Sequence, residues 1–407
     1  MTDTRFATLL RRGVAEIITE AELLRLLKSG RILTLKQGFD PSAPDIHLGH
    51  VVGLRKLRQF QELGHKVTLI VGDWTARIGD PSGQSVTRPM LTPNEIESNA
   101  RTYMDQFFKV VDKDKTELRW QSEWFSQFTL DEVIKLTSKF TIAQLLARED
   151  FNKRYSSGNP ISLAEMLYPL LQGYDSVAIK ADVEFGGIDQ KFNCLVGREL
   201  QQSTGQPPQQ VFLVPLLIGT DGHHKMSKSL NNHIGIAEPP QEIYGKVMSI
   251  PDSLILDYFE LVTDVPEEEI AEFKKQLKTH SVNPMNLKKR LAYEIVNQFH
   301  STEIAREAEK YFQGRFQTRE LHKIEVADSI NIKEEMLAIF TKDMPRWLVD
   351  NKFANSMGEA KRLLAQGAVR VIRADGTSQV VKDEKATLRP GDKIKVGKRH
   401  LSEIRRG

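Results

Sequence analysis

The chain has 407 residues, 40% of them hydrophobic and 27% charged, and its formal net charge is +3. This length favours two or three domains, and the balanced composition excludes a wholly disordered or fibrous chain. The longest apolar stretch, residues 211–218, is far shorter than the roughly 20 residues that cross a bilayer. The N-terminus lacks a signal-peptide pattern, and the single cysteine, Cys194, cannot form an internal disulfide. We therefore expect a soluble cytoplasmic protein with no membrane contact.

The first 235 residues alternate between strand and helix patterns. Residues 31–39 have the pattern of a strand, residues 48–63 that of a helix, and residues 67–71 that of a buried strand. A strand, a helix and a strand within about 40 residues predict a βαβ unit with parallel strands. Residues 210–218 are a further strand candidate. Three later helix starts are predicted by capping boxes: Thr92 with Glu95, Thr129 with Glu132, and Ser162 with Glu165.

The later residues divide by pattern and by charge. The pattern is almost wholly helical from 236 to 330, and residues 343–407 contain 15 Lys and Arg against eight Asp and Glu, a charge of +7, so the rest carries −4. A basic module favours a polyanionic partner, although a solvated surface has the same charge. We predict an α/β fold: a parallel-sheet domain at 1–235, a helical domain at 236–330, a linker at 331–342 and a small α+β domain at 343–407.

A histidine pair stands at the start of the first predicted helix, which begins His47-Leu48-Gly49-His50. Ligands of a doubly wound sheet bind beyond the carboxyl ends of its strands, where the free N–H groups of a helix start favour phosphate. Two imidazoles there could hydrogen-bond phosphate oxygens, and Gly49 leaves room for a flat base or a ribose. The alternative is a pair of incidental surface histidines.

A basic loop, Lys225-Met226-Ser227-Lys228-Ser229, follows the strand candidate 210–218. A mobile loop with two lysines and two serines can wrap a polyphosphate and follow its charge as a bond breaks. Alone, such a loop is more typical of an ordinary surface, but together with the histidine segment it favours a triphosphate site. The absence of a GxGxxG or Walker lysine loop argues against ordinary dinucleotide or P-loop binding.

Three polar residues share one face of the helix predicted after Ser162. Tyr168, Gln172 and Asp175 lie at positions i, i+4 and i+7, among many apolar neighbours. Polar groups in such surroundings need partners. A structural network would supply them, and so would a zwitterionic substrate that carries a phenol.

These segments resemble the class I aminoacyl-tRNA synthetases. His47–His50 is similar to their HIGH signature, and Lys225–Ser229 is their KMSKS signature. The segments between them resemble the tyrosyl-tRNA synthetase family across essentially the whole chain: Gly79-Asp80-Pro81-Ser82-Gly83, Tyr168 to Asp175, and Gly186-Gly187-Ile188-Asp189-Gln190. The resemblance implies a Rossmann-like catalytic domain that activates L-tyrosine with ATP and Mg²⁺ and charges tRNA(Tyr). It also implies a homodimer with no prosthetic group, and the sequence offers no dedicated metal cage.

The resemblance also implies roles for individual residues. Asp80, Tyr168 and Gln172 would bind the substrate ammonium, and Asp175 would accept a hydrogen bond from the phenol. The other expected contacts are to the substrate carboxyl group (Gln190), the ribose (Asp189), the phosphates (His47, His50, Lys225, Lys228) and elsewhere on ATP (Ser42, Gly49, Met226, Ser227, Ser229), with Asp40 beside Ser42 on the amino-acid side.

One position departs from the family pattern. Many tyrosyl enzymes have a tyrosine that reaches the substrate hydroxyl where this chain has Lys36. Lys36 could pair with Asp175, donate to the phenolic oxygen, or point away. Phenol recognition therefore depends more heavily on Asp175.

Residues 356–369 resemble a small RNA-binding module first known from a ribosomal small-subunit protein. The cations that we expect to meet an RNA backbone are Lys361 and Arg362 on its helix and, on the β segments, Arg370, Arg373, Lys398 and Arg399. The helical region 236–330 resembles the anticodon-side domain of the family.

Two other functions remain open at this point. The related tryptophanyl enzyme is disfavoured by the set Tyr168, Gln172 and Asp175 and by the basic C-terminal module. A non-catalytic RNA-binding protein on a synthetase scaffold would not need both signature segments.

Overall fold

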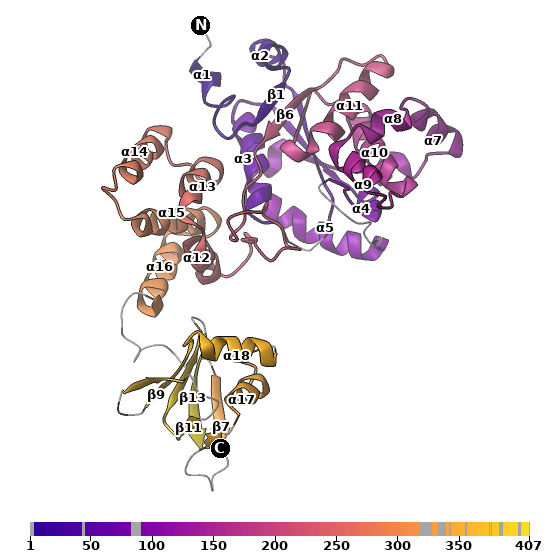
Figure 1. The fold of residues 1–407 in the computed structure, drawn as a ribbon. Helices are drawn as coiled ribbons and strands as arrows, with labels where there is room; N and C mark the ends of the chain where they lie inside the picture. The colour runs from indigo at the N-terminus through magenta and orange to yellow at the C-terminus, as the bar shows by residue number, and fades with distance from the viewer. Residues whose placement is uncertain are drawn as a thin grey trace. The chain divides into compact units, whose positions relative to one another are not determined.

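The computed structural model describes residues 4–42, 45–82, 91–316, 328–332, 339–341, 343–354, 356–373, 375, 377–381, 386–397 and 400–406. The chain forms two compact units, Met1–Phe312 and Gln313–Gly407 (Figure 1). The predicted α/β class is confirmed by the first unit, and the second is a small α+β unit.

A six-stranded sheet forms the centre of the first unit, with the order β1-β6-β5-β2-β3-β4. All neighbouring strands are parallel except β1, which pairs antiparallel with β6 at the edge. The strands are β1 (Glu16–Ile18), β2 (Thr34–Phe39), β3 (Lys66–Val71), β4 (Thr116–Trp120), β5 (Val183–Gly187) and β6 (Gln210–Val214).

The predicted βαβ unit is β2, α3 (Leu48–Glu62) and β3. Val51, Leu54 and Leu57 of α3 are fully buried. Each buried side chain of this size contributes roughly 1.5–3 kcal/mol of hydrophobic stabilisation, so α3 is held firmly on the sheet. Along β2, Lys36 bonds to α10 (Leu163–Ile179), whereas a side chain at Gly53 of α3 would meet Gln37. The two helices therefore cover opposite faces of the sheet.

Further helices surround the sheet, and the three predicted capping boxes are present at their starts. Close packing joins α10 to α11, because a Cβ on Gly173 would lie 3.0 Å from the backbone nitrogen of Gly197. The further helices are α1 (Thr4–Ala7), α2 (Glu20–Lys28), α4 (Thr75–Ile78), α5 (Pro93–Phe107), α6 (Ser122–Phe125), α7 (Leu130–Thr137), α8 (Ile142–Leu146), α9 (Glu149–Ser156) and α11 (Lys191–Ser203), with short 3₁₀ turns at Lys113–Lys115 and Ile188–Gln190.

The helices that follow residue 236 share the hydrophobic core of the first unit. They are α12 (Pro240–Ser249), α13 (Ile255–Val262), α14 (Glu267–Lys278), α15 (Pro284–Phe299) and α16 (Thr302–Phe316), with a 3₁₀ turn at Asp252–Leu254. Tyr258 and Leu291 belong to the same buried cluster as Leu54. Arg12 and Arg55 also donate to backbone carbonyls at the end of α13, such as that of Thr263. The structure thus differs from the predicted boundary at 235/236, because the helical region has no separate core.

The second unit contains a five-stranded sheet of order β10-β9-β12-β13-β7 and a two-stranded β11–β8 pair. Its elements are β7 (Asp328–Ile332), β8 (Ile339–Thr341), α17 (Met344–Asp350), α18 (Met357–Ala365), β9 (Val369–Ile372), β10 (Ser378–Val380), β11 (Ala386–Leu388), β12 (Lys393–Val396) and β13 (His400–Arg406). The predicted linker 331–342 needs correction, since its described residues lie mostly in β7 and β8, which pair with β13 and β11. Residues 317–327, 333–338 and 342 lie outside the described residues.

Candidate active site

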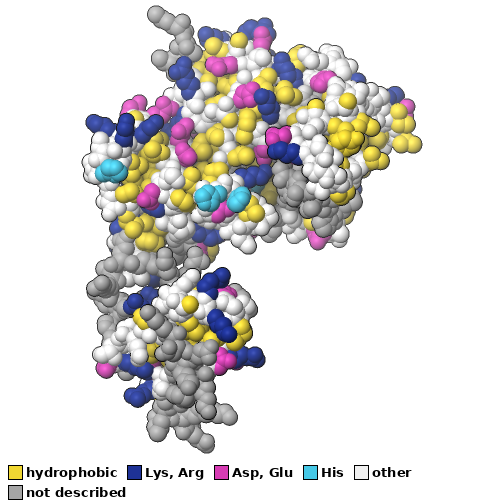
Figure 2. Space-filling view, viewed as in Figure 1, with side chains coloured by type: hydrophobic (Ala, Val, Ile, Leu, Met, Phe, Trp, Pro, Cys, Tyr) yellow, Lys and Arg dark blue, Asp and Glu magenta, His cyan; other side chains and the backbone are white. Residues whose placement is uncertain are grey.

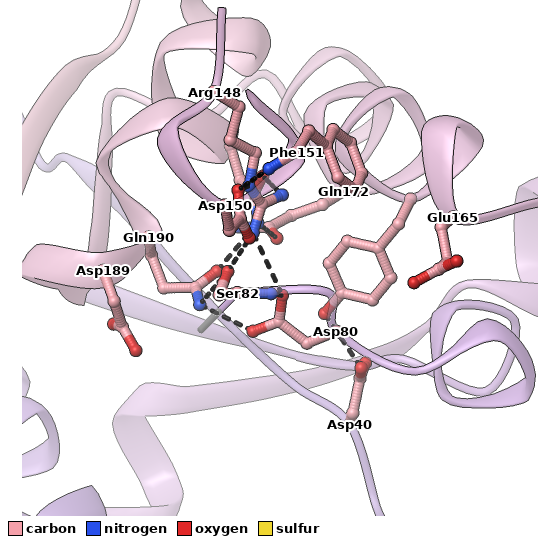
Figure 3. Close-up of polar contacts among 12 residues, drawn as sticks. Asp40, Asp80, Ser82, Arg148, Asp150, Phe151, Glu165, Gln172, Asp189 and Gln190 are labelled. Carbon is pink, nitrogen blue, oxygen red and sulfur yellow. Dashed lines mark hydrogen bonds and ion pairs between the residues drawn. The ribbon is translucent and has the colours of Figure 1, made fainter. Parts of the chain in front are cut away.

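The candidate site lies at the carboxyl ends of the parallel strands. Asp40 follows β2, and Asp189 and Gln190 follow β5 (Figure 3). Tyr168 reaches Asp40 from α10. This is the edge at which ligands of doubly wound sheets bind.

The structure brings the two signature segments together. The N–H of Leu48 donates to the carbonyl of Ile234 over 3.0 Å, and the N–H of Ile236 donates to the carbonyl of Ile46 over 3.2 Å. On the KMSKS segment, Lys228 Nζ lies 4.0 Å from Asp45 Oδ2. The start of α3 and the basic loop thus form one surface.

The two histidines at the start of α3 hold each other in a defined orientation. Nδ1 of His47 accepts from the N–H of Gly49, and Nδ1 of His50 accepts from the N–H of His47, each over 3.2 Å. Burial lowers the pKa of both imidazoles, that of His50 to about 4 with the help of the Lys228 charge. Both rings are therefore neutral at pH 7, and because Nδ1 is an acceptor, Nε2 carries the proton. Each ring can donate one hydrogen bond to a phosphate oxygen.

Asn232, three residues after the KMSKS segment, holds that segment in place. The side-chain Oδ1 of Asn232 accepts from the N–H of Ser227 over 2.7 Å. Its Nδ2 lies 3.1 Å from the carbonyl oxygen of Lys225 and 3.0 Å from Oδ2 of Asp221. Asn232, which is buried, was missed by the sequence analysis, because one asparagine in a polar loop gives no signal of such contacts.

Within the loop, the predicted residues have separate surroundings. Lys225 Nζ donates to Asp189 Oδ2 over 2.8 Å, and Met226 is buried. The hydroxyls of Ser227 and Ser229 are 2.8 Å apart. The predicted ribose ligand Asp189 therefore lies beside the first signature lysine.

Hydrogen bonds connect the predicted amino-acid ligands in two separate groups. Tyr168 OH donates to Asp40 Oδ2 over 2.8 Å, and Thr75 Oγ1 lies 2.7 Å from Asp40 Oδ1. Burial and the neighbouring Asp40 raise the pKa of Tyr168, so its hydroxyl stays protonated. Gln190 donates to Asp80 Oδ2 over 2.7 Å, and the N–H of Ser82 donates to Asp80 Oδ1.

Arg148 is a buried cation that the sequence analysis missed. Its guanidinium donates to Ser82 Oγ and to Asn193 Oδ1 and lies 3.7 Å from Asp80 Oδ1 (Figure 3). It also pairs with Asp150 over 2.7 Å. Arg148 thus joins α9 to the loop after β3, and its partners Ser82 and Asn193 lie too far along the chain for spacing to reveal them.

Asp175 is fully buried and has two neutral donors. Gln121 Nε2 donates to one carboxylate oxygen over 2.9 Å and Trp124 Nε1 to the other over 3.2 Å. Burial raises the pKa of Asp175 to about 7, and Lys36 opposes this rise. Gln121 and Trp124, both after β4, were also missed.

Two further predicted residues are Ser42, which follows β2, and Gly49, which lies at the start of α3. Ser42 is exposed, and its N–H donates to the carbonyl of Asp40. A Cβ on Gly49 would come within 2.9 Å of the His47 ring, so glycine is needed there to keep the ring in place.

Gln172 bonds to Asn193 and Glu184 from α10.

The C-terminal unit carries Lys and Arg on its surface (Figure 2). Lys361, Arg362 and Arg370 are exposed. Arg373 is different, since it pairs with the buried Asp392 over 2.6 Å and donates to the carbonyl of Thr387, so its interpretation as an RNA-facing cation needs correction. Lys398 and Arg399 lie outside the described residues.

Two searches of the described residues were negative. No group of three or more His, Cys, Asp or Glu side chains is placed to hold a metal ion in that part of the chain. None of the helices that the structure describes combines the length and apolar character of a membrane span.

The model of the family "tRNA synthetases class I (W and Y)" matches residues 28–317. With the parallel sheet and the paired HIGH-like and KMSKS segments, this match defines the chain as a class I aminoacyl-tRNA synthetase. It is 56% identical to a tyrosine–tRNA ligase of Dehalococcoides mccartyi, with 97% of each chain covered. It is 48% identical to that of Thermotoga maritima, with 100% of this chain and 99% of the relative covered. The chain belongs to the tyrosyl-tRNA synthetase family.

Solved structures support the fold. The first unit is similar to a truncated Aspergillus nidulans mitochondrial tyrosyl-tRNA synthetase, with a TM-score of 0.64 and 22% identity over 77% of this chain and 94% of that one. A second similar structure is the Archaeoglobus fulgidus tyrosyl-tRNA synthetase complexed with L-tyrosine. Its TM-score is 0.60, at 23% identity over 74% of this chain and 98% of that one. At these identities the likeness shows the fold alone.

Proposed function

We propose that this chain activates L-tyrosine with ATP to tyrosyl-adenylate and transfers the tyrosyl group to the 3′ end of tRNA(Tyr). The observation that carries the proposal is the pairing of residues 46–48 with 234–236, together with Lys228, whose charge is close enough to both imidazoles to lower their pKa. The buried Asp175 beside Tyr168 and Gln172 supports a substrate that carries a phenol.

The first step is an in-line attack by the tyrosine carboxylate on the ATP α-phosphorus, and the bond to the pyrophosphate oxygen breaks. A carboxylate is already a nucleophile, so the site must position the reactants and neutralise phosphate charge. His47 and His50 donate from Nε2 to phosphate oxygens, while Lys225 and Lys228 stabilise the departing pyrophosphate. Mg²⁺ enters with ATP. In the second step the terminal ribose hydroxyl of the tRNA attacks the adenylate carbonyl and releases AMP.

On the amino-acid side, Asp80, Tyr168 and Gln172 bind the ammonium and Gln190 contacts the carboxyl group. Gln190 and Asp80 are bonded to each other, and Tyr168 is bonded to Asp40, so these contacts set the positions of the proposed ligands. Asp189 binds the ribose near Lys225.

ATP–pyrophosphate exchange with each amino acid tests the proposal. We expect exchange with tyrosine, and exchange with tryptophan alone, or with no amino acid, would overturn the assignment. Lys228→Ala should slow exchange by about 10²–10³-fold at a nearly unchanged tyrosine affinity, because the lysine acts on charge that develops during reaction. Lys275→Ala, which removes an exposed charge on α14, is the control and should be silent.

The C-terminal unit is proposed to bind the tRNA backbone through Lys361, Arg362 and Arg370. Replacing these exposed residues with Ala should weaken tRNA binding and make it less dependent on salt, because each lost phosphate contact releases one fewer counterion. ATP–pyrophosphate exchange should be unaffected.

We also propose that the chain works in the cytoplasm as a homodimer. Large apolar side chains stand exposed on neighbouring helices α7 to α10, and a face of this kind is typical of a protein–protein interface. They are Leu130, Ile134, Ile142, Tyr155 and Leu163. Light scattering should give a dimer for the wild type and a monomer for a Leu130→Asp/Leu163→Asp variant.

A further inference from the structure

Two charged side chains are buried in the middle of the central sheet. Lys36 of β2 and Glu184 of β5 are neighbours in the parallel ladder, and their side chains are 0% and 1% exposed. Lys36 Nζ lies 2.9 Å from Glu184 Oε1. Charged groups are stable in a protein interior only where hydrogen bonds and opposite charges compensate for the loss of water. The contacts of this pair therefore indicate its role.

The ammonium group of Lys36 uses all three of its protons. It donates to the backbone carbonyl of Gln172 over 2.7 Å, to Ser176 Oγ over 2.8 Å and to Glu184. A lysine has three donors, so none is left for Asp175 or for a phenolic oxygen. Lys36 therefore does not take the place of the tyrosine that many relatives have there.

Glu184 contacts the same stretch of α10. Gln172 Nε2 and Ser176 Oγ each lie 3.3 Å from its carboxylate oxygens, and Gln209 Nε2 donates to it from the other side. The pair thus holds α10 at positions 172 and 176, one helical turn apart. Asp175 lies between these positions on the same helix.

We propose that the Lys36–Glu184 pair is the positioning element of the phenol site, and that it determines selectivity for a ring that bears a hydroxyl. The inference rests on the proposed function. The positive charge of Lys36 favours the ionised form of Asp175, and Lys36 does not compete for its oxygens. A charged, well-placed carboxylate accepts a hydrogen bond from the phenol, whereas phenylalanine leaves one acceptor site of the buried carboxylate unfilled.

Opposite electrostatic effects of the two residues make the proposal testable. The charged groups that face Asp175 are Lys36 from β2 and Glu184 from β5, while Gln121 and Trp124 are neutral donors. Lys36 lowers the pKa of Asp175, and Glu184 raises it. Loss of the Lys36 charge should raise the pH at which Asp175 ionises, and loss of the Glu184 charge should lower it.

The experiment uses the full chain with Lys36→Met, Glu184→Gln and the double variant. The pH dependence of kcat/KM for tyrosine in ATP–pyrophosphate exchange is measured between about pH 5.5 and 9. We expect the rising limb of Lys36→Met to shift upward and that of Glu184→Gln downward, each by about one pH unit, with the double variant near the wild type. Selectivity for tyrosine over phenylalanine should fall at least about tenfold in Lys36→Met.

The proposal would be overturned if the rising limbs of Lys36→Met and Glu184→Gln shifted in the same direction or did not shift. This outcome counts only if both variants have the unfolding temperature of the wild type. If Lys36→Met does not fold, the double variant decides, because it removes both charges of the pair together: we expect it to lose selectivity, and full retention overturns the proposal. Lys36→Arg keeps the charge and should leave the limb in place. Failure of the proposed function is distinct, because the wild type itself would then show no exchange with tyrosine.

Discussion

At the scale of single residues, the site depends on side chains whose protonation is set by burial. His47 and His50 are neutral donors, while Asp175 has a pKa raised to about 7. A histidine with its ordinary pKa of 6.5 would change charge near neutrality. We therefore expect the pH dependence of the first step near neutrality to follow Asp175 and not the imidazoles.

Substitution of His50 checks this assignment. His50→Ala removes the Nε2–H donor and should slow ATP–pyrophosphate exchange by about 10²-fold, with the position of the rising pH limb unchanged. His50→Gln places an amide N–H near the same point and should recover part of the rate. A limb that moves in either variant would show that His50 titrates in this range.

The sequence analysis identified the signature residues but not the side chains that hold them. His47 to His50 and Lys225 to Ser229 are contiguous, so a short pattern reveals them. Asn232, Arg148 and Gln121 are isolated polar residues whose contacts exist only after folding. The role of Lys36 was open for the same reason, since its partner Glu184 lies on another strand.

At the scale of elements, the KMSKS loop depends on Asn232. Asn232→Ala would release the N–H of Ser227 and the carbonyl of Lys225 from their shared partner. We expect exchange to slow about tenfold, with a raised KM for ATP and an unchanged KM for tyrosine. Asn286→Ala on the exposed face of α15 should have no effect, and an equal loss for tyrosine would contradict a role confined to the loop.

The α10–α11 contact gives a matched pair of glycine substitutions. Gly173→Ala should destabilise the protein by about 1–3 kcal/mol, because the new methyl group would meet the backbone of Gly197 at 3.0 Å. Gly245→Ala on α12 meets nothing within 4 Å and should stabilise by up to about 1 kcal/mol, since alanine favours a helix. Denaturant unfolding measures both, and equal effects would refute close packing at Gly173.

Local sequence predicted the elements well where their signals were strong. The capping boxes at Thr92, Thr129 and Ser162 mark true helix starts, and β2, α3 and β3 follow the predicted order. The short strands β7 and β8 were missed, because three to five residues carry little periodicity and their partners β13 and β11 lie far along the chain. Pairing, rather than propensity, makes these residues strands.

At the scale of the whole molecule, the two units have separate cores. A chain truncated after Phe316 should therefore keep ATP–pyrophosphate exchange and lose most tRNA charging. Calorimetry should show one unfolding transition for the truncated chain and two for the full chain. Truncation that abolishes exchange, or that leaves charging intact, would contradict this division of labour.

We predicted a domain boundary at 235/236 because the strand pattern ends there. A sequence pattern does not show whether two regions share one hydrophobic core. Leu54 of α3 and Tyr258 of α13 lie in one cluster, and Arg55 binds the carbonyl of Thr263. A change from alternating to helical pattern thus marked a change of architecture inside one folded unit.

This shared burial has a practical consequence for anyone who recombines synthetases. A chimaera joined at residue 235 would separate α3 from the carbonyl of Thr263 that Arg55 binds. It would also remove the apolar side chains that pack against α3, the helix at whose start both signature histidines lie. A graft made after Phe316 keeps α16 whole and leaves the shared core of the first unit intact. We therefore expect exchange of the C-terminal unit, the proposed tRNA-binding part, to be the safer route to altered tRNA preference, whereas the helices from α12 to α16 must be exchanged together with the sheet whose core they share.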